Sequence, residues 1–307
     1  MKILGACPVC GGSGDPWADV HDRHYANEGT WKIDECERCS ARYLNPMPSE
    51  TELGNYYPTE YYSHQSTPVT GTSLKDRVKR IVLPLGSKEP EFTHAGRFVD
   101  VGSGSGWMLD HYASRGWDAV GVEYSEAACD VGRQRGRTMC CGSLIAAGLE
   151  TESFDYVRSN HSFEHLNNPH ETLAEMSRIL KPGGTLFIGV PDTKGLMARV
   201  FRSEWYYTGA PVHTINYNRK NLAHLVEQHG FVVQSVRGNS THGGPIGSLQ
   251  SWFIKRRGRG SLSGGMVTMA PLILIGFWFS RLLDLCRLGD CVEIIATKPR
   301  AVPEPSQ

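Results

Sequence analysis

The sequence has no surplus of charge, no internal repeat and no apolar run long enough to span a membrane. Its 307 residues include 32 basic and 32 acidic side chains, so the whole molecule has no electrostatic preference for nucleic acid or anionic lipid. The first residues lack the apolar core of a secretory signal. We therefore expect a cytoplasmic protein, either free or at the inner face of the membrane. A hydrophobic content of 40% suits an ordinary globular core.

Four of the nine cysteines form two close pairs, Cys7 with Cys10 and Cys36 with Cys39. Two C-x-x-C knuckles can surround one Zn²⁺ with four thiolates, and such a closed shell is a structural site. An odd cysteine count with this pairing favours a reducing compartment, where thiolates hold metal in preference to forming disulfides. The sequence therefore predicts a structural zinc site made of these four residues.

Two histidines between the knuckles, His21 and His24, are alternative zinc ligands. The surrounding residues 1–50 show little helical or strand periodicity, which is typical where a metal replaces a hydrophobic core. A linker follows over residues 51–95, with a tyrosine-rich stretch at 56–62 and then a basic segment of partly helical character.

From residue 96 the pattern alternates between strands and helices, which favours a mostly parallel sheet covered on both faces. The expected strands are 97–101, 118–123, 137–141, 154–159, 185–190, 231–233 and 292–297. The predicted fold is a doubly wound, seven-stranded Rossmann-like α/β domain with a small zinc-ribbon-like module before it. The catalytic domain would comprise residues 96–238 and 290–300, interrupted by a helical insertion at 239–289.

A glycine-rich loop, residues 102–106, follows the first of these strands directly. Glycines let the backbone approach a ligand closely at the carboxyl edge of a sheet, where the next helix also begins. The following strand ends at Glu123, where a carboxylate can bind both ribose hydroxyls. A nicotinamide dinucleotide would need a glycine at the position of Trp107. The loop therefore indicates a different nucleoside cofactor.

The loop with its preceding acidic residue, together with residues 154–157, 162–166 and 180–186, resembles the class I S-adenosylmethionine-dependent methyltransferases. The resemblance implies that the cofactor is held by Asp100, Gly102, Ser103, Gly104, Gly106, Glu123, Tyr124, Ser143, Leu144 and Asn160. Within this set the loop would hold the methionine end, Glu123 the ribose, and Ser143 with Leu144 the adenine. Ser143 departs from the family pattern, which often has an aspartate there.

The knuckles, followed by residues 44–49 and the tyrosine-rich stretch, resemble bacterial methyltransferases of cell-surface polysaccharide and sugar-tailoring pathways. This implies O-methylation of a sugar, a nucleotide-sugar or a lipid-linked glycan. The same scaffold could methylate carbon or nitrogen, so the acceptor atom stays open. A rival resemblance is to ribosomal RNA methyltransferases with a zinc knuckle. Residues 1–50 disfavour RNA, because they carry five basic and eight acidic side chains. A non-catalytic zinc-dependent interaction protein is a third alternative, against which the intact loop and Glu123 argue.

Methylation of an alcohol requires a proton acceptor, and histidine is the usual one near neutral pH. His161 and His165 follow the fourth strand of the domain, and His213 follows the fifth. Glu164 could orient either imidazole. We expect His165 or His213 to act as the base, while a structural hydrogen bond remains the alternative role for His165.

The insertion contains an apolar run, residues 266–280. It is interrupted by Pro271 and is shorter than the roughly 20 residues of a membrane-spanning helix. Its apolar positions Leu272, Ile275, Phe279, Leu282 and Cys286 can share one helical face. With the neighbouring basic residues, we expect residues 255–287 to contact a membrane interface peripherally. Burial against its own domain or against a twin subunit is the alternative, and the oligomeric state stays open.

Overall fold

The computed structural model describes residues 1–56, 89–257, 262 and 265–300. The tyrosine-rich stretch beyond Tyr56 and the basic linker segment, including Lys75 and Arg80, lie outside the described residues. So does Arg259 of the basic cluster in the insertion.

A seven-stranded sheet forms the centre of the molecule, in the order β10-β11-β8-β7-β4-β5-β6. Its strands are β4 Arg97–Val101, β5 Asp118–Glu123, β6 Thr138–Cys141, β7 Phe154–Asn160, β8 Leu180–Pro191, β10 Val232–Gly238 and β11 Cys291–Thr297. Strands β4 to β8 pair in parallel, whereas β11 runs antiparallel to both of its neighbours. This is the predicted doubly wound, Rossmann-like α/β architecture.

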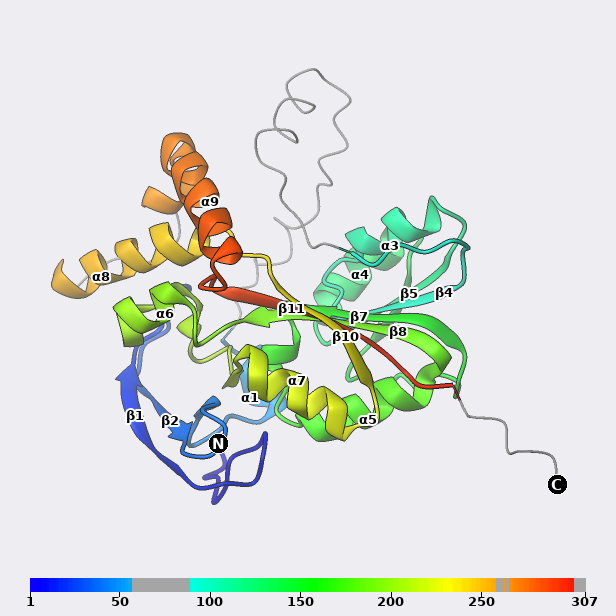
Figure 1. The fold of residues 1–307 in the computed structure, drawn as a ribbon, viewed down its shortest axis with the longest axis horizontal. Coiled ribbons are helices and arrows are strands. Elements are labelled where there is room, and N and C mark those ends of the chain that lie inside the picture. The colour runs from blue at the N-terminus through cyan, green and yellow to red at the C-terminus, as the bar shows by residue number, and fades with distance from the viewer. Residues whose placement is uncertain (57–88, 258–261, 263–264, 301–307) are drawn as a thin grey trace.

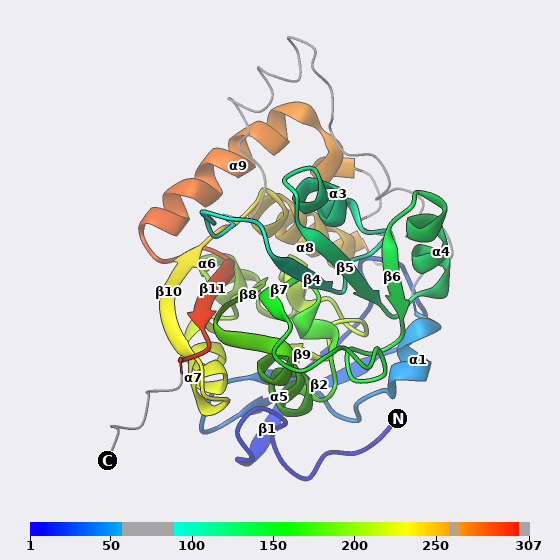
Figure 2. The same ribbon diagram turned by 90° about the vertical axis from the view of Figure 1, so that its right-hand side faces the viewer.

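Helices cover both faces of the sheet. They are α3 Trp107–Ala113, α4 Glu126–Gln134, α5 Pro169–Ile179 and α7 Arg219–Gln228. Helices α3 and α4 lie on one face, and α5 and α7 on the other (Figures 1 and 2). Successive residues of a strand point to opposite faces, so Phe98 packs with Tyr112 of α3 while Val99 packs with Leu173 of α5 and Leu222 of α7.

The N-terminal module has more regular structure than its sequence pattern predicted. It contains β1 Gly14–Val20, β2 Trp31–Cys36, β3 Arg42–Leu44 and the short helix α1 Glu50–Gly54. The expectation of little strand structure is wrong, because the strands are short and β1 is interrupted by a bulge at Pro16, which hides the alternation. A small apolar cluster around Val20, Trp31, Ile33 and Leu44 supports the sheet.

The module is joined to the catalytic domain by strand pairing. Strand β9, Ile215–Asn216, follows β8 in the chain and adds to the edge of β3, where Arg42 pairs with Asn216 and Tyr43 with Ile215. The four-stranded sheet therefore has the order β1-β2-β3-β9. A segment of the catalytic domain thus completes the sheet of the module.

The insertion is helical. After helix α6, Leu196–Phe201, the 3₁₀ turns Arg202–Glu204 and Tyr206–Thr208 lead to β9, and the insertion itself begins beyond β10. It contains a π-helical turn Gly243–Gly247, helix α8 Ser248–Arg257, a 3₁₀ turn Gly265–Thr268 and helix α9 Ala270–Leu285. Among the described residues, no helix is both long and apolar enough to cross a bilayer.

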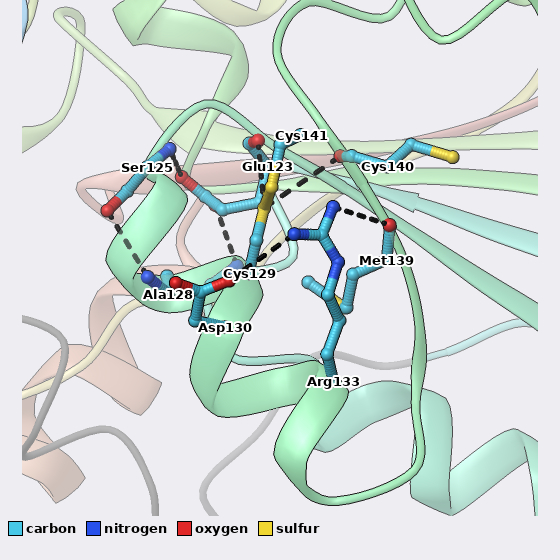
Figure 3. Close-up of a disulfide and its surroundings, with 10 residues drawn as sticks. Glu123, Ser125, Ala128, Cys129, Asp130, Arg133, Met139, Cys140 and Cys141 are labelled. Atoms are coloured by element: carbon cyan, nitrogen blue, oxygen red, sulfur yellow. Dashed lines mark hydrogen bonds and ion pairs between the residues drawn. A yellow bond between two sulfur atoms is a disulfide. The ribbon is translucent and has the colours of Figure 1, made fainter.

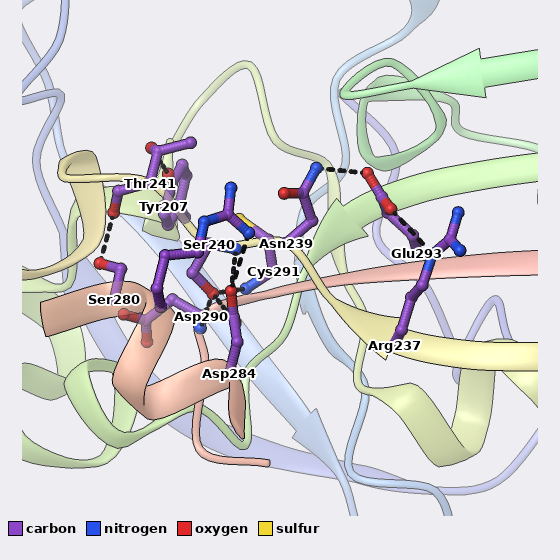
Figure 4. Close-up of polar contacts among 11 residues, drawn as sticks. Tyr207, Arg237, Asn239, Ser240, Thr241, Ser280, Asp284, Asp290, Cys291 and Glu293 are labelled. Atoms are coloured by element: carbon purple, nitrogen blue, oxygen red, sulfur yellow. Dashed lines mark hydrogen bonds and ion pairs between the residues drawn. The ribbon is translucent and has the colours of Figure 1, made fainter. Parts of the chain in front are cut away.

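Ser240 holds the base of the insertion together (Figure 4). Its Oγ donates to Asp284 Oδ1 of α9 at 2.7 Å and accepts from the backbone N–H groups of Asp290 at 2.7 Å and Cys291 at 3.1 Å. Ser280 Oγ of α9 also donates to the carbonyl of Thr241 at 2.8 Å. The start and the end of the insertion are therefore bonded to each other at the sheet edge.

We expect Ser240→Ala to lower the free energy of unfolding by about 1–3 kcal/mol, because it leaves the partly buried Asp284 carboxylate and two amides short of a partner. Denaturant unfolding would measure this change. Ser114→Ala is the matched control, since the Ser114 hydroxyl donates only to a carbonyl of its own exposed helix end. Equal stability of the two variants would contradict the role given to Ser240.

Candidate active site

The glycine loop connects β4 to α3 at the carboxyl edge of the sheet. Gly102, Gly104 and Gly106 have φ values of 74°, 55° and 83°, a region that disfavours other residues. A Cβ on Gly102 would lie 2.2 Å from Cβ of Ser162, so the loop packs directly on the segment after β7. The backbone is therefore held in one conformation beside the amino terminus of α3.

Glu123 ends β5 and supports this loop. Its Oε2 accepts the N–H of Gly104 at 2.8 Å, and its Oε1 accepts the N–H of Ser125 at 2.9 Å. The side chain is buried yet lines the cavity described next. The sequence predicted that Glu123 would bind the ribose. It did not predict that the same carboxylate fixes the loop against β5.

A cavity of about 950 Å³ opens at this edge of the sheet. The predicted cofactor residues that line it are Asp100, Gly102, Ser103, Gly104, Glu123, Tyr124, Ser143, Leu144 and Asn160. Gly106 does not line it. The volume is within the range of pockets that enclose a drug-sized ligand. Loop amides, one carboxylate and the apolar walls at Leu144, Ile145 and Trp107 fit the charged, sugar and base portions of a nucleoside cofactor.

Arg158 of β7 is a site residue that the sequence reasoning missed. Its guanidinium is buried and pairs with Asp100 at 2.9 Å and with Glu89 at 2.9 Å. Burial raises the pKa of the Asp100 carboxyl to about 6, although the Arg158 charge opposes that shift. Asp100 thus lines the cavity while one of its oxygens is bound to Arg158. A single arginine inside an otherwise buried strand was the signal available in the sequence.

The four candidates for proton transfer lie close together but do not all face the cavity. His161 and His165 line it, whereas His213 and Glu164 do not. The rings of His165 and His213 meet edge to face, with centroids 4.7 Å apart. His161 Nδ1 lies 3.5 Å from Oε1 of the fully buried Glu164. His165 is therefore part of the cavity wall, while His213 contacts the His165 ring and is not among the residues that line the cavity.

Backbone carbonyls fix both inner imidazoles. Nδ1 of His165 lies 2.9 Å from the carbonyl of Val212, and Nδ1 of His213 lies 2.9 Å from that of Tyr207. Each neutral ring therefore donates from Nδ1 and carries its lone pair on Nε2. Burial lowers the pKa of His165, and burial together with the neighbouring His165 lowers the pKa of His213 to about 3.

Glu164 carries the negative charge of this cluster. Burial raises its pKa, but the imidazoles of His161, His165 and His213 outweigh burial and lower that pKa to about 2. Because the inner rings are neutral at neutral pH, an imidazolium formed at His165 would gain from the adjacent carboxylate. The cluster can therefore accept a proton from a group in the cavity.

The four knuckle cysteines converge on one point. Sγ of Cys7 lies 3.8 Å from Sγ of Cys39, Sγ of Cys10 lies 3.4 Å from Sγ of Cys36, and all four sulfurs lie within 4.8 Å of one another. Tetrahedral zinc with bonds of about 2.3 Å separates its sulfurs by roughly 3.8 Å. The thiol set therefore fits a zinc ion.

The two alternative zinc ligands are engaged elsewhere. His21 Nδ1 bonds the carbonyl of Gly29 at 2.9 Å, and His24 Nε2 bonds that of Tyr206 at 2.8 Å. Neither belongs to the cysteine group. His24 instead packs edge to face on the Tyr206 ring, with centroids 4.7 Å apart.

The module also shapes the cavity. Leu53 and Glu50 of α1 are part of the cavity wall, which the sequence did not predict. Asn218 and Asn221, at the start of α7, each donate to the carbonyl of Cys39 at 3.1 Å. The second knuckle is therefore anchored on the catalytic domain.

Cys129 of α4 and Cys141 of β6 form a disulfide beside Glu123 (Figure 3). Their Cα atoms are 6.1 Å apart, within the range for such a bond. The sequence did not predict this pairing, because it does not show that α4 packs on β6 at this point.

Comparison with known proteins identifies the domain. Residues 69–236 match the family model described as a methyltransferase domain. The chain belongs to this family. Its cofactor is S-adenosylmethionine, as the cavity and its donors suggested.

The relatives differ in what their names state. A C-methyltransferase, NovU of Streptomyces niveus, is 27% identical over 272 residues, which are 80% of this chain and 60% of that protein. The demethylmenaquinone methyltransferase of Renibacterium salmoninarum is 34% identical over 94 residues, 30% of this chain and 40% of that one. The chain thus spans no more than 60% of the length of these two relatives.

A solved structure shares the fold. The [4+2]-cyclase SpnF is similar over 83% of this chain and 98% of its own, with a TM-score of 0.54 and 15% identity. At this identity the likeness concerns the arrangement of the sheet and helices alone.

We expect Glu123→Gln to weaken binding of S-adenosylmethionine by about 1–3 kcal/mol, since the neutral amide loses charge-assisted hydrogen bonds to the ribose and to the loop. Titration calorimetry would measure this change. Glu126→Gln, on the exposed first turn of α4, is the matched control. Unchanged affinity of the Glu123 variant would remove this carboxylate from the cofactor site.

Proposed function

We propose that the protein transfers a methyl group from S-adenosylmethionine to a hydroxyl of a sugar, a nucleotide-sugar or a lipid-linked glycan in cell-surface polysaccharide biosynthesis. The observation that carries this proposal is His165, which lines the cavity, carries its lone pair on Nε2 and lies against the buried Glu164 carboxylate. That arrangement suits removal of a proton from an alcohol.

The cofactor supplies an electrophilic methyl group on a sulfonium. The chain aligns the acceptor with that methyl group and excludes water. His165 takes the hydroxyl proton at Nε2, while its Nδ1–H remains hydrogen-bonded to the carbonyl of Val212. Glu164 stabilises the resulting imidazolium, and His213 packs behind the ring and keeps it in place. His213 is thus assigned as a positioning residue, and His161 as a second cavity-facing imidazole.

Polar side chains next to His165 support a hydroxyl-rich acceptor. Asn168, Glu171 and Thr172, at the start of α5, line the cavity together with Glu50 of α1. Carboxylates and amides are suited to hydrogen bonds with sugar hydroxyls. Asn168, Glu171 and Thr172 follow His165 within seven residues and line the same cavity, so an acceptor bound there would share that cavity with the proposed base.

C-methylation is a second candidate, which the match to the C-methyltransferase NovU over 80% of this chain favours. The same base would then remove a proton from a carbon next to a carbonyl. Incubation with methyl-labelled S-adenosylmethionine and a panel of sugar nucleotides, 4-keto sugar nucleotides and lipid-linked glycans would decide between the two. Labelling of ribosomal RNA and of none of these sugars would overturn both.

We expect His165→Ala to retain cofactor affinity and to lose about 10²- to 10⁴-fold in turnover. In the unaltered enzyme the base works only when deprotonated. Burial lowers the pKa of His165, so the acidic limb of the kcat/KM profile should lie below its ordinary value of 6.5. The variant should lose that limb.

His213→Ala is the paired control for this experiment. A positioning residue should chiefly raise the KM of the acceptor and leave an acidic limb in the profile. Normal turnover of the His165 variant, with an inactive His213 variant that still binds cofactor, would reverse the two assignments. Normal turnover of both would remove the need for a protein base.

We also propose that Cys7, Cys10, Cys36 and Cys39 hold one structural Zn²⁺, which their converging sulfurs support. Elemental analysis of protein purified under reducing conditions should find about one zinc per chain. Cys36→Ser should lose the metal and also weaken cofactor binding, because the module forms part of the cavity wall. Cys286→Ser, at an exposed thiol, should change neither. Metal-free wild-type protein with full cofactor affinity would refute the proposal.

A further inference from the structure

Helix α9 has an apolar outer face. The large apolar residues exposed on this helix are Leu274, Ile275, Trp278, Phe279, Leu282 and Leu285. Ile275 is 64% exposed, Trp278 52% and Leu282 56%. These three recur at intervals of three and four residues, so they form one stripe along the helix. Leu272, which the sequence placed on this face, is instead half-buried.

The opposite face fixes the rotation of this helix. A Cβ on Gly276 would lie 2.7 Å from the side chain of Ile246, so α9 packs closely on the π-helical turn. Phe277 is fully buried, and Ser280 bonds the carbonyl of Thr241. The apolar stripe is therefore held outward by specific contacts on the inner side.

The same segment carries almost only positive charge. Residues 248–288 contain six basic side chains and one acidic side chain, Asp284. The carboxylate of Asp284 is already bonded to Ser240 and Arg281 at the base of the insertion. The whole chain is neutral, so this positive charge is a local feature of the insertion.

The basic end of α8 borders a groove of about 710 Å³. Arg202, Lys255 and Arg256 line it together with Trp252, and Arg256 lies over the indole with 3.7 Å from its guanidinium carbon to the ring centroid. The charge of Lys255 is paired with Glu204, with 3.2 Å between Nζ and Oε1. The groove thus keeps a positive charge beside an aromatic wall, which suits an anionic headgroup at an interface.

The insertion leaves the sheet at the edge that holds the cofactor cavity. It begins after the carboxyl end of β10 and ends at the amino end of β11, and β11 is antiparallel to β10. Both ends are therefore at the edge where the glycine loop follows β4. Helices α8 and α9 both extend from this side of the molecule, in different directions (Figure 1).

We propose that the apolar stripe of α9 and the basic end of α8 dock the protein on an anionic lipid surface, with α9 lying in the interface. Apolar side chains enter the boundary between headgroups and acyl chains, and arginines bind the anionic headgroups. A second copy of the chain is a poorer occupant, because it would bring the same positive charge against this surface. The proposal concerns binding and does not depend on the acceptor.

Co-sedimentation of the full chain with phosphatidylcholine vesicles, with and without phosphatidylglycerol, tests the proposal. The protein should bind the anionic vesicles, and added salt should weaken that binding. The triple variant Ile275→Ser, Trp278→Ser, Leu282→Ser should lose about tenfold or more in vesicle partitioning. The double variant Ile3→Ser, Val232→Ser is the control, since both sites are exposed apolar positions far from α9 in the sequence.

A second pair of variants tests the charge. Arg256→Glu with Arg257→Glu should abolish the preference for anionic vesicles. The double variant Arg115→Glu, Arg133→Glu is the control. Arg115 follows α3 and Arg133 lies on α4. This variant makes the same change in net charge and should preserve the preference for anionic vesicles. Titration with S-adenosylmethionine verifies that each variant is folded, and this readout is separate from vesicle binding.

Three outcomes would overturn the proposal. The first is wild-type protein that stays in the supernatant with anionic vesicles. The second is equal binding to neutral and anionic vesicles. The third is a dimer in analytical ultracentrifugation that the triple α9 variant converts to a monomer, which would assign the stripe to a second copy.

Discussion

The centre of the molecule depends on the ion pairs that the buried guanidinium of Arg158 makes with Asp100 and Glu89. A charge removed from water must be paired, and leaving such a charge uncompensated costs about 3–5 kcal/mol. Arg158 meets this requirement with Asp100 on the neighbouring strand and Glu89 before the sheet. The pair with Asp100 fixes the end of β4 just where the glycine loop begins. The cofactor site is thus built on a charge pair inside the sheet as well as on the loop.

The sequence predicted those parts of the structure that depend on local patterns. The strands of the main sheet, the helix that begins at Pro169 and the glycine loop all follow from spacing within a short window. The convergence of the four knuckle cysteines was also predictable, since their paired spacing is local. What escaped prediction depends on packing between distant segments. Arg158 is a site residue because Asp100 lies beside it on another strand, and Glu50 lines the cavity because the module folds against the domain.

The histidine cluster illustrates the same limit. His165 and His213 were equal candidates in the sequence, since each follows a strand at the catalytic edge. The structure distinguishes them by exposure to the cavity, with His165 in the wall and His213 behind it. Tautomer assignment also needed three dimensions, because the carbonyls that receive the two Nδ1–H bonds belong to Val212 and Tyr207. The sequence gives the residue types and their order, but not which carbonyl lies beside each imidazole.

Pairing of β3 with β9 affects how the protein is made on the ribosome. Arg42 and Tyr43 are synthesised early, whereas their partners Asn216 and Ile215 emerge only after most of the catalytic sheet. The two knuckles, in contrast, are complete once Cys39 has been added. If these thiols hold the zinc ion proposed for them, metal capture can precede domain folding, while the outer edge of β3 stays unpaired until late in translation. An unpaired strand edge can bind other nascent chains, so the time needed to translate the chain from β3 to β9 sets how long this edge is exposed.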